Sequence, residues 1–139
     1  VLFLHKHMTK TDARARVLEL LELVGLGSAI SRLDALPHEF SGGQRQQVAV
    51  GRALMTQPEV LMLDEPTAGV SPIVMDELFD RILEIKQTGI AILMVEQNAR
   101  QALGIADTGY VLVTGENKFT DTGEALLADP EVRRAFLGG

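Results

Sequence analysis

Two short apolar runs, 60–63 and 90–95, stand on either side of a segment with a helical pattern, and this arrangement strongly constrains the fold. Both runs are continuous rather than alternating, which is typical of strands buried on both faces of a parallel sheet. Between them, Ser71-Pro72 indicates a helix start and Gly89 a helix stop. A strand, a crossover helix and a second strand form the repeating unit of a parallel sheet. The sequence therefore predicts an α/β fold.

The rest of the chain predicts further elements on both sides of this unit. Upstream, a helix begins at Asp12, which we expect to be its N-cap, and a second helix covers about 43–56. Downstream, the predicted elements are a helix capped by Asn98, a hairpin of strands 110–113 and 118–122, and two short helices at 124–127 and 130–137.

The charge balance excludes one class of function. The chain carries 13 basic and 19 acidic side chains, a formal net charge of −6. A protein that coats nucleic acid needs clustered Lys and Arg to bind phosphates, so we expect no nucleic-acid partner. Cysteine is absent, which leaves no thiolate for metal binding or nucleophilic catalysis. The apolar runs are also too short to span a bilayer.

Two adjacent carboxylates, Asp64 and Glu65, end the first apolar run. In α/β proteins, ligands bind beyond the carboxyl ends of the strands. Adjacent residues on a strand point to opposite sides, which would give the two acids different tasks. One can hold Mg²⁺, largely through water, and the other can orient a water molecule for attack on a phosphate. The alternative is a strand that simply ends in an acidic turn.

Ser41-Gly42-Gly43, at the start of the second predicted helix, is another candidate site. Glycines let backbone N–H groups approach an anion closely, and the helix dipole adds about half a positive charge at this end. Ser41 adds a hydroxyl donor. Taken by itself, the segment is better explained as a Ser-capped helix with a glycine turn. Its place one helix upstream of the strand ending in Asp64 shifts this balance toward a functional site.

Together these residues resemble the ATP-binding cassette (ABC) ATPases. The segment Phe40-Ser41-Gly42-Gly43-Gln44 is similar to the family's signature motif, Leu-Ser-Gly-Gly-Gln, with Phe in place of Leu. Residues 60–65 resemble the Walker B strand, and residues 66–71 resemble the D-loop that follows it. The resemblance covers nearly the whole chain. It implies part of a P-loop NTPase core with parallel strands, together with the helical subdomain that carries the signature motif.

The resemblance also implies roles for individual residues, with ATP hydrolysis as the reaction and ATP and Mg²⁺ as cofactors. Asp64 is expected to bind the Mg²⁺ shell, and Glu65 is expected to be the catalytic carboxylate. The residues expected to contact the γ-phosphate of an ATP molecule held by a second ATP-binding subunit are those of the signature motif: Ser41, Gly42, Gly43 and Gln44.

One departure from the family is the Walker A loop, Gly-x-x-x-x-Gly-Lys-Ser/Thr, because no Gly-Lys dipeptide occurs in the 139 residues. That loop cradles the β- and γ-phosphates. The chain therefore resembles the C-terminal portion of an ABC domain whose Walker A half is absent, and we expect this portion alone to be inactive. Residues 1–58 are then the helical subdomain with its upstream connection, and residues 59–139 the C-terminal part of the ATPase core.

A second departure is Gln97, which stands where the family's switch histidine usually follows the second strand. Glutamine can donate a hydrogen bond to a γ-phosphate but cannot carry charge. We therefore expect Gln97 to contribute to catalysis through a hydrogen bond alone. The three histidines, His5, His7 and His38, match no motif.

Residues 68–72, 95–98 and 128–139 resemble the ATP-binding subunits of branched-chain amino acid importers. This implies import of a small solute, a branched-chain or other hydrophobic amino acid, that other subunits select. The implied partners are a second ATP-binding subunit, transmembrane permease subunits and, indirectly, a periplasmic or extracellular solute-binding protein. The implied location is the cytoplasmic face of the cell membrane, as a peripheral protein.

Two other functions are compatible with the same motifs. The missing Walker A loop favours a catalytically silent interaction module for the isolated chain. A soluble ABC ATPase of DNA repair or translation would also carry the signature and Walker B motifs. The net charge of −6 and the importer-like ending count against this last alternative.

Overall fold

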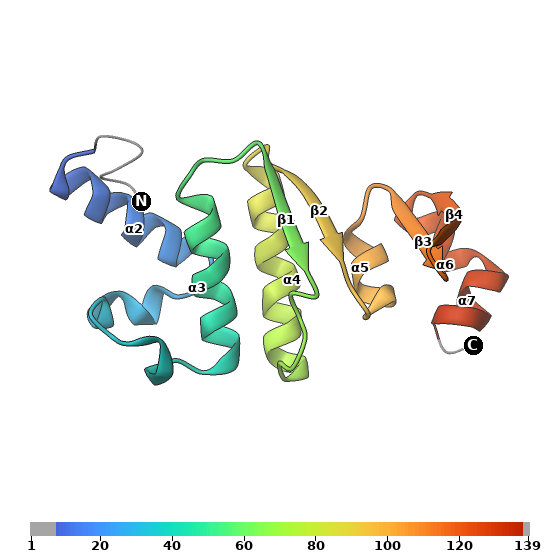
Figure 1. The fold of residues 1–139 in the computed structure, drawn as a ribbon, viewed down its shortest axis with the longest axis horizontal. Helices are drawn as coiled ribbons and strands as arrows, with labels where there is room; N and C mark the ends of the chain where they lie inside the picture. Colours follow the sequence, from blue (N-terminus) through green and yellow to red (C-terminus); the bar gives the residue numbers. More distant parts are fainter. Residues whose placement is uncertain (1–7, 138–139) are drawn as a thin grey trace. The chain divides into compact units, whose positions relative to one another are not determined.

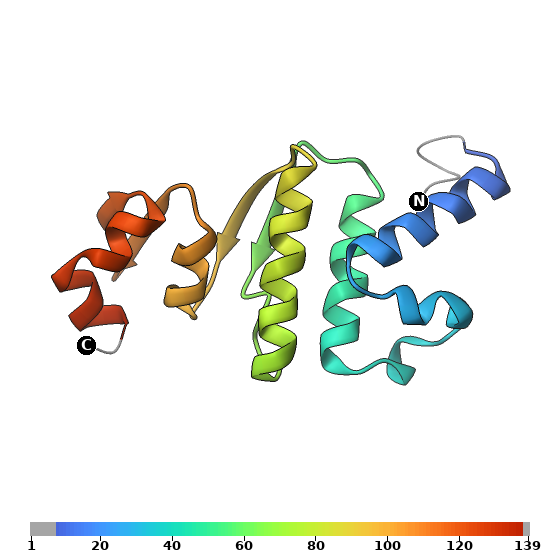
Figure 2. The same cartoon turned by 180° about the vertical axis from the view of Figure 1, so that it is seen from behind.

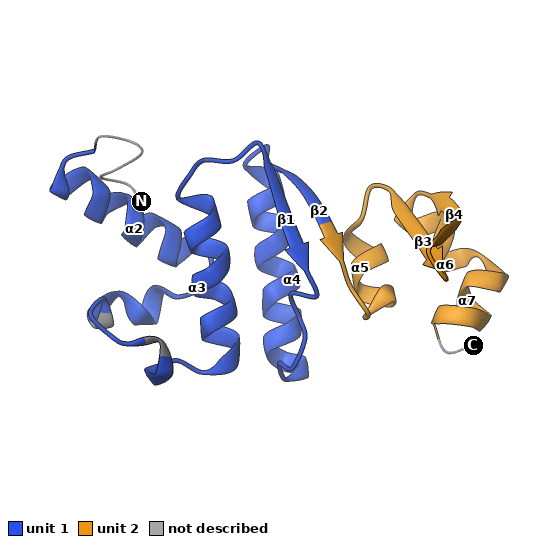
Figure 3. Ribbon diagram, viewed as in Figure 1, with its two compact units in different colours: residues 1–93 blue, residues 94–139 orange. Residues whose placement is uncertain are grey.

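The structure is a computed structural model that describes residues 8–137. It divides into two units, residues 1–93 and residues 94–139 (Figure 3). The boundary that we predict between residues 58 and 59 falls inside the first unit, and it stays a prediction about the domain organisation. Each unit is described by itself.

Unit 1 begins with helices and continues as strand, helix, strand (Figure 1). Its elements, in chain order, are α2 (Lys10–Leu23), the 3₁₀ turns η1 (Gly27–Arg32) and η2 (Pro37–Glu39), α3 (Gly42–Leu54), β1 (Val60–Asp64), α4 (Pro72–Gln87) and β2 (Ala91–Val95). The last two residues of β2 belong to unit 2.

The predicted cap of the first helix is wrong by one turn. Thr9, not Asp12, is the N-cap of α2: its hydroxyl oxygen accepts a hydrogen bond of 3.2 Å from the backbone N–H of Asp12. The Thr9 hydroxyl also donates to the Asp12 carboxylate at 2.6 Å. Asp12 therefore lies inside the first turn, where its negative charge interacts favourably with the positive end of the helix dipole.

The two other predicted starts in unit 1 are confirmed. Ser41 caps α3, and Ser71 caps α4 with Pro72 at the first helical position. Helices α3 and α4 run side by side in the views from the front and from behind (Figures 1 and 2). The most deeply buried side chains of the unit are Val24 and Leu26, which follow α2, Leu54 on α3 and Ile85 on α4.

Strands β1 and β2 are neighbours in a parallel, two-stranded sheet, as the strand–helix–strand order predicts. The prediction that both strands are buried on both faces is wrong. Leu61 and Leu63 are buried, but Met62 is 72% exposed and Leu93 on β2 is 52% exposed. A continuous apolar run shows that a strand can be buried on both faces. Whether both faces are covered depends on the elements that pack against the strand.

The open apolar face leads to a prediction about the isolated chain. Contiguous exposed apolar side chains favour association, so we expect the 139-residue chain to self-associate in solution. Static light scattering should show a mass above 15.1 kDa that rises with concentration. Met62→Lys and Leu93→Lys should shift the mass toward the monomer, whereas Gln87→Lys, at an exposed position at the end of α4, should not. A monomeric parent chain at high concentration would contradict this expectation.

Unit 2 follows the predicted order of a helix, a hairpin and two short helices. Its elements are α5 (Ala99–Ile105), β3 (Gly109–Val113), β4 (Glu116–Asp121), α6 (Gly123–Ala128) and α7 (Pro130–Phe136). The hairpin is antiparallel and turns at Thr114-Gly115, both with positive φ, so that β4 begins two residues earlier than predicted. Leu103, Leu126 and Val132 form the core of this unit.

Candidate functional site

The first turn of α3 is held by reciprocal capping between Ser41 and Gln44. The Ser41 hydroxyl oxygen accepts from the backbone N–H of Gln44 at 3.2 Å, and the Gln44 side-chain oxygen accepts from the backbone N–H of Ser41 at 3.0 Å. This is a capping box, and the Ser-x-x-Gln spacing is its sequence signal. This capping role of Gln44 was not predicted, although the spacing is visible in the sequence. The capping leaves the hydroxyl hydrogen of Ser41 and the amide group of Gln44 as donors.

The segment before this turn is fixed as well. The Arg45 guanidinium donates to the Phe40 carbonyl oxygen at 3.0 Å, which holds the chain where it enters the helix. Ser41 and Gly42 are exposed, while Gly43 and Gln44 are half-buried. The residues that the sequence predicts to contact a phosphate, Ser41, Gly42, Gly43 and Gln44, therefore form one turn with N–H groups at a helix start, which we call the signature turn.

The two predicted acids lie at the carboxyl end of β1. Asp64 is the last residue of the strand and is exposed, whereas Glu65 follows it and is half-buried. Glu65 has a φ of +43°, outside the strand region, so the expected alternation of two strand residues does not apply to it. The backbone N–H of Ala68 donates to the Glu65 carbonyl oxygen at 3.0 Å, which closes a tight turn. We call residues 64–68 the acidic turn.

The left-handed conformation of Glu65 is unfavourable for a residue with a side chain, and more so before a proline. The surroundings hold it in place, because Pro66 is among the most deeply buried residues and Thr67 is only 6% exposed. Conformations of this kind cost roughly 1–3 kcal/mol and cluster at functional sites.

A groove between α3 and β1 runs beside Asp64. Its lining includes Gln46, Ala49 and Ala53 from the helix and Met62 and Asp64 from the strand, and its volume is about 180 Å³. Pockets for small molecules commonly measure about 300–1,000 Å³. The groove is therefore too small to hold a nucleotide by itself, which agrees with a site that needs further residues.

The signature turn and the acidic turn belong to the same edge of unit 1. Helices α3 and α4 run parallel to each other and opposite to β1, so both helix N-termini and the carboxyl end of β1 point the same way (Figures 1 and 2). A helix N-terminus favours an anion such as a phosphate, and a pair of carboxylates favours a divalent cation.

Gln97, the third predicted site, belongs to unit 2. Its side chain is exposed in the segment between β2 and α5, and its carbonyl oxygen accepts from the backbone N–H of Ala99 at 2.8 Å. Asn98 occupies the predicted N-cap position of α5, but its side chain makes no capping bond. It donates instead to the Gln101 side-chain oxygen at 2.6 Å.

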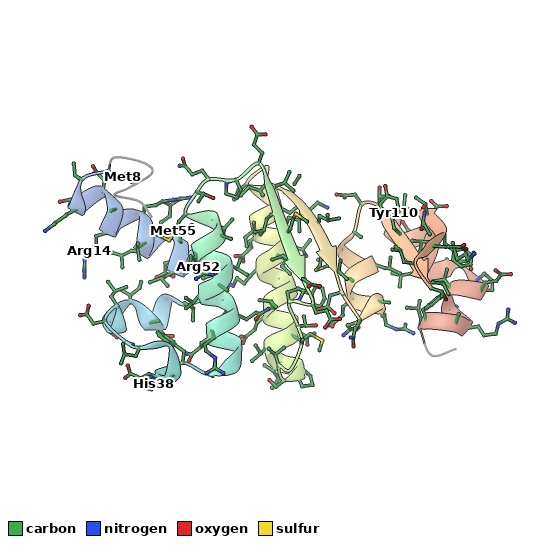
Figure 4. The ribbon with its side chains drawn as sticks, viewed as in Figure 1. Met8, Arg14, His38, Arg52, Met55 and Tyr110 are labelled. Atoms are coloured by element: carbon green, nitrogen blue, oxygen red, sulfur yellow. The ribbon has the colours of Figure 1, made fainter. Side chains whose placement is uncertain are left out.

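The donor set at the acidic turn fits Mg²⁺. This ion prefers carboxylate oxygen, and it commonly binds one or two carboxylates together with water and substrate phosphates. The exposed carboxylate of Asp64 meets that need without a preformed cage, and no group of three or more metal-ligating side chains occurs among the described residues. His38 lies exposed on η2 (Figure 4), and His5 and His7 lie outside the described residues.

None of the helices within residues 8–137 combines the length and the apolar character that a membrane span requires.

Comparisons with known proteins agree with the resemblance seen in the motifs. The sequence model described as ABC transporter matches residues 1–68. The high-affinity branched-chain amino acid transport ATP-binding protein BraG of Pseudomonas aeruginosa is 42% identical over 130 residues, which cover 94% of this chain and 55% of BraG. The lipopolysaccharide export system ATP-binding protein LptB of Haemophilus influenzae is 32% identical over 138 residues, which cover 99% of this chain and 56% of LptB.

Solved structures show the same similarity. The ADP conformation of an ATP-binding cassette of an ABC transporter superposes with a TM-score of 0.75 at 31% identity. The match covers 95% of this chain and 52% of that one. The chain thus spans about half the length of the relatives that it matches. The predicted fold class, part of a P-loop ATPase core with a signature-bearing helical region, is confirmed.

Proposed function

The chain belongs to the family of ABC transporter ATP-binding proteins, and from that premise we propose that it works as part of an ATPase subunit that drives import of a branched-chain or other hydrophobic amino acid. The observation that carries the proposal is the 42% identity to BraG over 94% of the chain. Identity to the lipopolysaccharide exporter subunit is lower, 32%. This difference favours the importer over the exporter.

We propose that the acidic turn acts on the ATP molecule of its own subunit. Asp64 would hold Mg²⁺ through water, and the bound ion would neutralise charge on the phosphates. Glu65 would orient the attacking water and accept its proton. The strained conformation and buried surroundings of Glu65 support this role, because they fix the direction in which the carboxylate leaves the backbone. Gln97 would add a hydrogen bond to the γ-phosphate.

The signature turn would act on an ATP molecule held by a second ATP-binding subunit. The hydroxyl of Ser41, the backbone N–H groups of Gly42 and Gly43 and the side-chain amide of Gln44 are donors suited to a γ-phosphate. Two subunits would then close on ATP and reopen after hydrolysis. Transmembrane permease subunits would transmit this motion to the solute path, with a periplasmic or extracellular solute-binding protein acting indirectly. The proposed location is peripheral, on the cytoplasmic face of the membrane.

A chimera tests the proposal. This chain would replace the matched region of BraG in cells that lack BraG, and uptake of labelled leucine and ATP hydrolysis by the purified subunit would be measured. We expect both activities, and we expect the Glu65→Gln chimera to lose both. Hydrolysis without uptake would contradict the proposed solute. A folded chimera without hydrolysis would contradict the proposed ATPase activity. The matching replacement in LptB, assayed for lipopolysaccharide export, is the control for general exchangeability.

The 139-residue chain by itself is expected to bind Mg-ATP weakly. The sequence contains no Gly-Lys dipeptide and hence no phosphate-binding loop of the Walker A type, and that loop supplies most of the phosphate contacts. Titration calorimetry should give no saturable heat at micromolar concentrations, whereas the BraG chimera should bind. Micromolar affinity of the isolated chain would show that another segment binds the phosphates, and would favour a module that holds nucleotide in a different way.

A further inference from the structure

The two glycines of the signature turn have different surroundings. A Cβ atom built on Gly42 would meet no other described side chain or backbone within 4 Å, apart from its own helix and chain neighbours. A Cβ atom built on Gly43 would lie 2.7 Å from Cγ1 of Val74, closer than real contacts of this kind. The second glycine therefore lets α3 approach α4, and the first leaves its backbone open.

Val74 is well fixed on its side of this contact. It lies in the first turn of α4, where its backbone N–H donates to the capping hydroxyl oxygen of Ser71 at 3.5 Å. A β-branched side chain in a helix has one strongly preferred rotamer. Val74 is also half-buried, so its methyl group cannot swing away from Gly43 without cost.

We propose that Val74 is a positioning residue that sets the place of the signature turn through Gly43, an inference that rests on the proposed function where it concerns ATP. A glycine at position 43 leaves room for the Val74 methyl group, and the backbone of the turn is thereby held in one place. The same contact joins the two turns of the site. Three residues separate the acidic turn from the first residue of α4, so the position of Ser71 and Val74 links the signature turn to Glu65.

The packing can be tested in the 139-residue chain without nucleotide. Gly43→Ala should raise the unfolding constant by about fivefold, because overpacking against Val74 outweighs the better helix propensity of alanine. In the Val74→Ala background, the same substitution should lower the constant by about twofold, because only the propensity gain is left. Gly42→Ala, with open space around it, should lower the constant by a similar factor in both backgrounds.

Chemical denaturation of the four combinations at positions 43 and 74 measures this change of sign, with the two Gly42→Ala chains as the matched control. If Gly43→Ala had the same effect in both backgrounds, positions 43 and 74 would not be coupled, and the proposed packing contact would be wrong. This result does not depend on ATP, so it decides the packing even if the chimera shows that the proposed function is wrong.

The positioning role has its own readout in the BraG chimera. Val74→Ala should leave the binding of nucleotide within a subunit unchanged and weaken ATP-dependent dimerisation by roughly tenfold, since a loss of about 1.4 kcal/mol is a factor of ten. Val74→Ile should keep dimerisation, and Gly43→Ala with Val74→Ala should dimerise better than either single variant, because the new methyl group replaces the lost one. Equal loss of dimerisation by Gly43→Ala with either residue at position 74 would show that the loss does not arise from the contact with Val74, and would overturn the proposal.

Discussion

Glu65→Gln is expected to reduce ATP turnover of the chimeric subunit by about 10²-fold or more, because positioned general bases contribute 10²–10⁴-fold. Glutamine keeps the shape and a hydrogen-bonding group but removes the charge and the basicity. A residue that orients the attacking water adds little to ground-state binding, so Mg-ATP should still bind. The ATP-bound, closed dimer should therefore accumulate, and size-exclusion chromatography with ATP should show it.

Asp64→Asn is the neighbouring control for this prediction. It removes the same charge one residue earlier, at the exposed end of β1. Because Asp64 is assigned to the Mg²⁺ shell, its loss should weaken Mg²⁺-dependent binding rather than trap a dimer. Hydrolysis at the parent rate by Glu65→Gln would show that the carboxylate assignment is wrong. If Asp64→Asn instead of Glu65→Gln trapped the closed dimer, Asp64 would be the catalytic carboxylate and Glu65 the Mg²⁺ ligand.

Local signals in the sequence predicted the frame of unit 1 well. Ser41 and Ser71 cap the helices that we assigned to them, and the apolar run that ends at Asp64 is a strand. These features depend on residues within one or two turns, so a linear reading can find them. Thr9 was missed because Asp12, three residues on, is also a good cap, and only the backbone conformation separates the two.

Features that depend on neighbours distant in sequence could not be predicted. Which side of β1 is exposed depends on the elements that pack against the strand. An apolar run such as 60–63 does not indicate which elements those are. The contact between Gly43 and Val74 joins two helices, and Gly-Gly in the signature turn looks like a single feature until α4 is in place. The positive φ of Glu65 also depends on how the acidic turn packs, since glutamate has no local preference for it.

Ser41→Asp is expected to weaken ATP-dependent dimerisation of the chimeric subunit by about 10²-fold, because a charge-assisted hydrogen bond contributes roughly 1.5–3 kcal/mol and repulsion of the γ-phosphate adds to its loss. Aspartate is as good an N-cap as serine, and its charge favours the positive end of the helix dipole. The capping oxygen that now accepts from Gln44 is thus retained. The stability of α3 should stay the same or increase while dimerisation falls.

Ser41→Asn separates the charge from the shape. Asparagine is also a good N-cap, has nearly the size of aspartate, and keeps an N–H donor for the phosphate. We therefore expect it to dimerise within about tenfold of the parent, since only the geometry of one hydrogen bond changes. Thermal unfolding of all three chains and ultracentrifugation of the chimeras with and without Mg-ATP supply the measurements. If Ser41→Asp dimerises as well as Ser41→Asn, no anion lies at the signature turn in the closed state, and Ser41 is only the cap of α3.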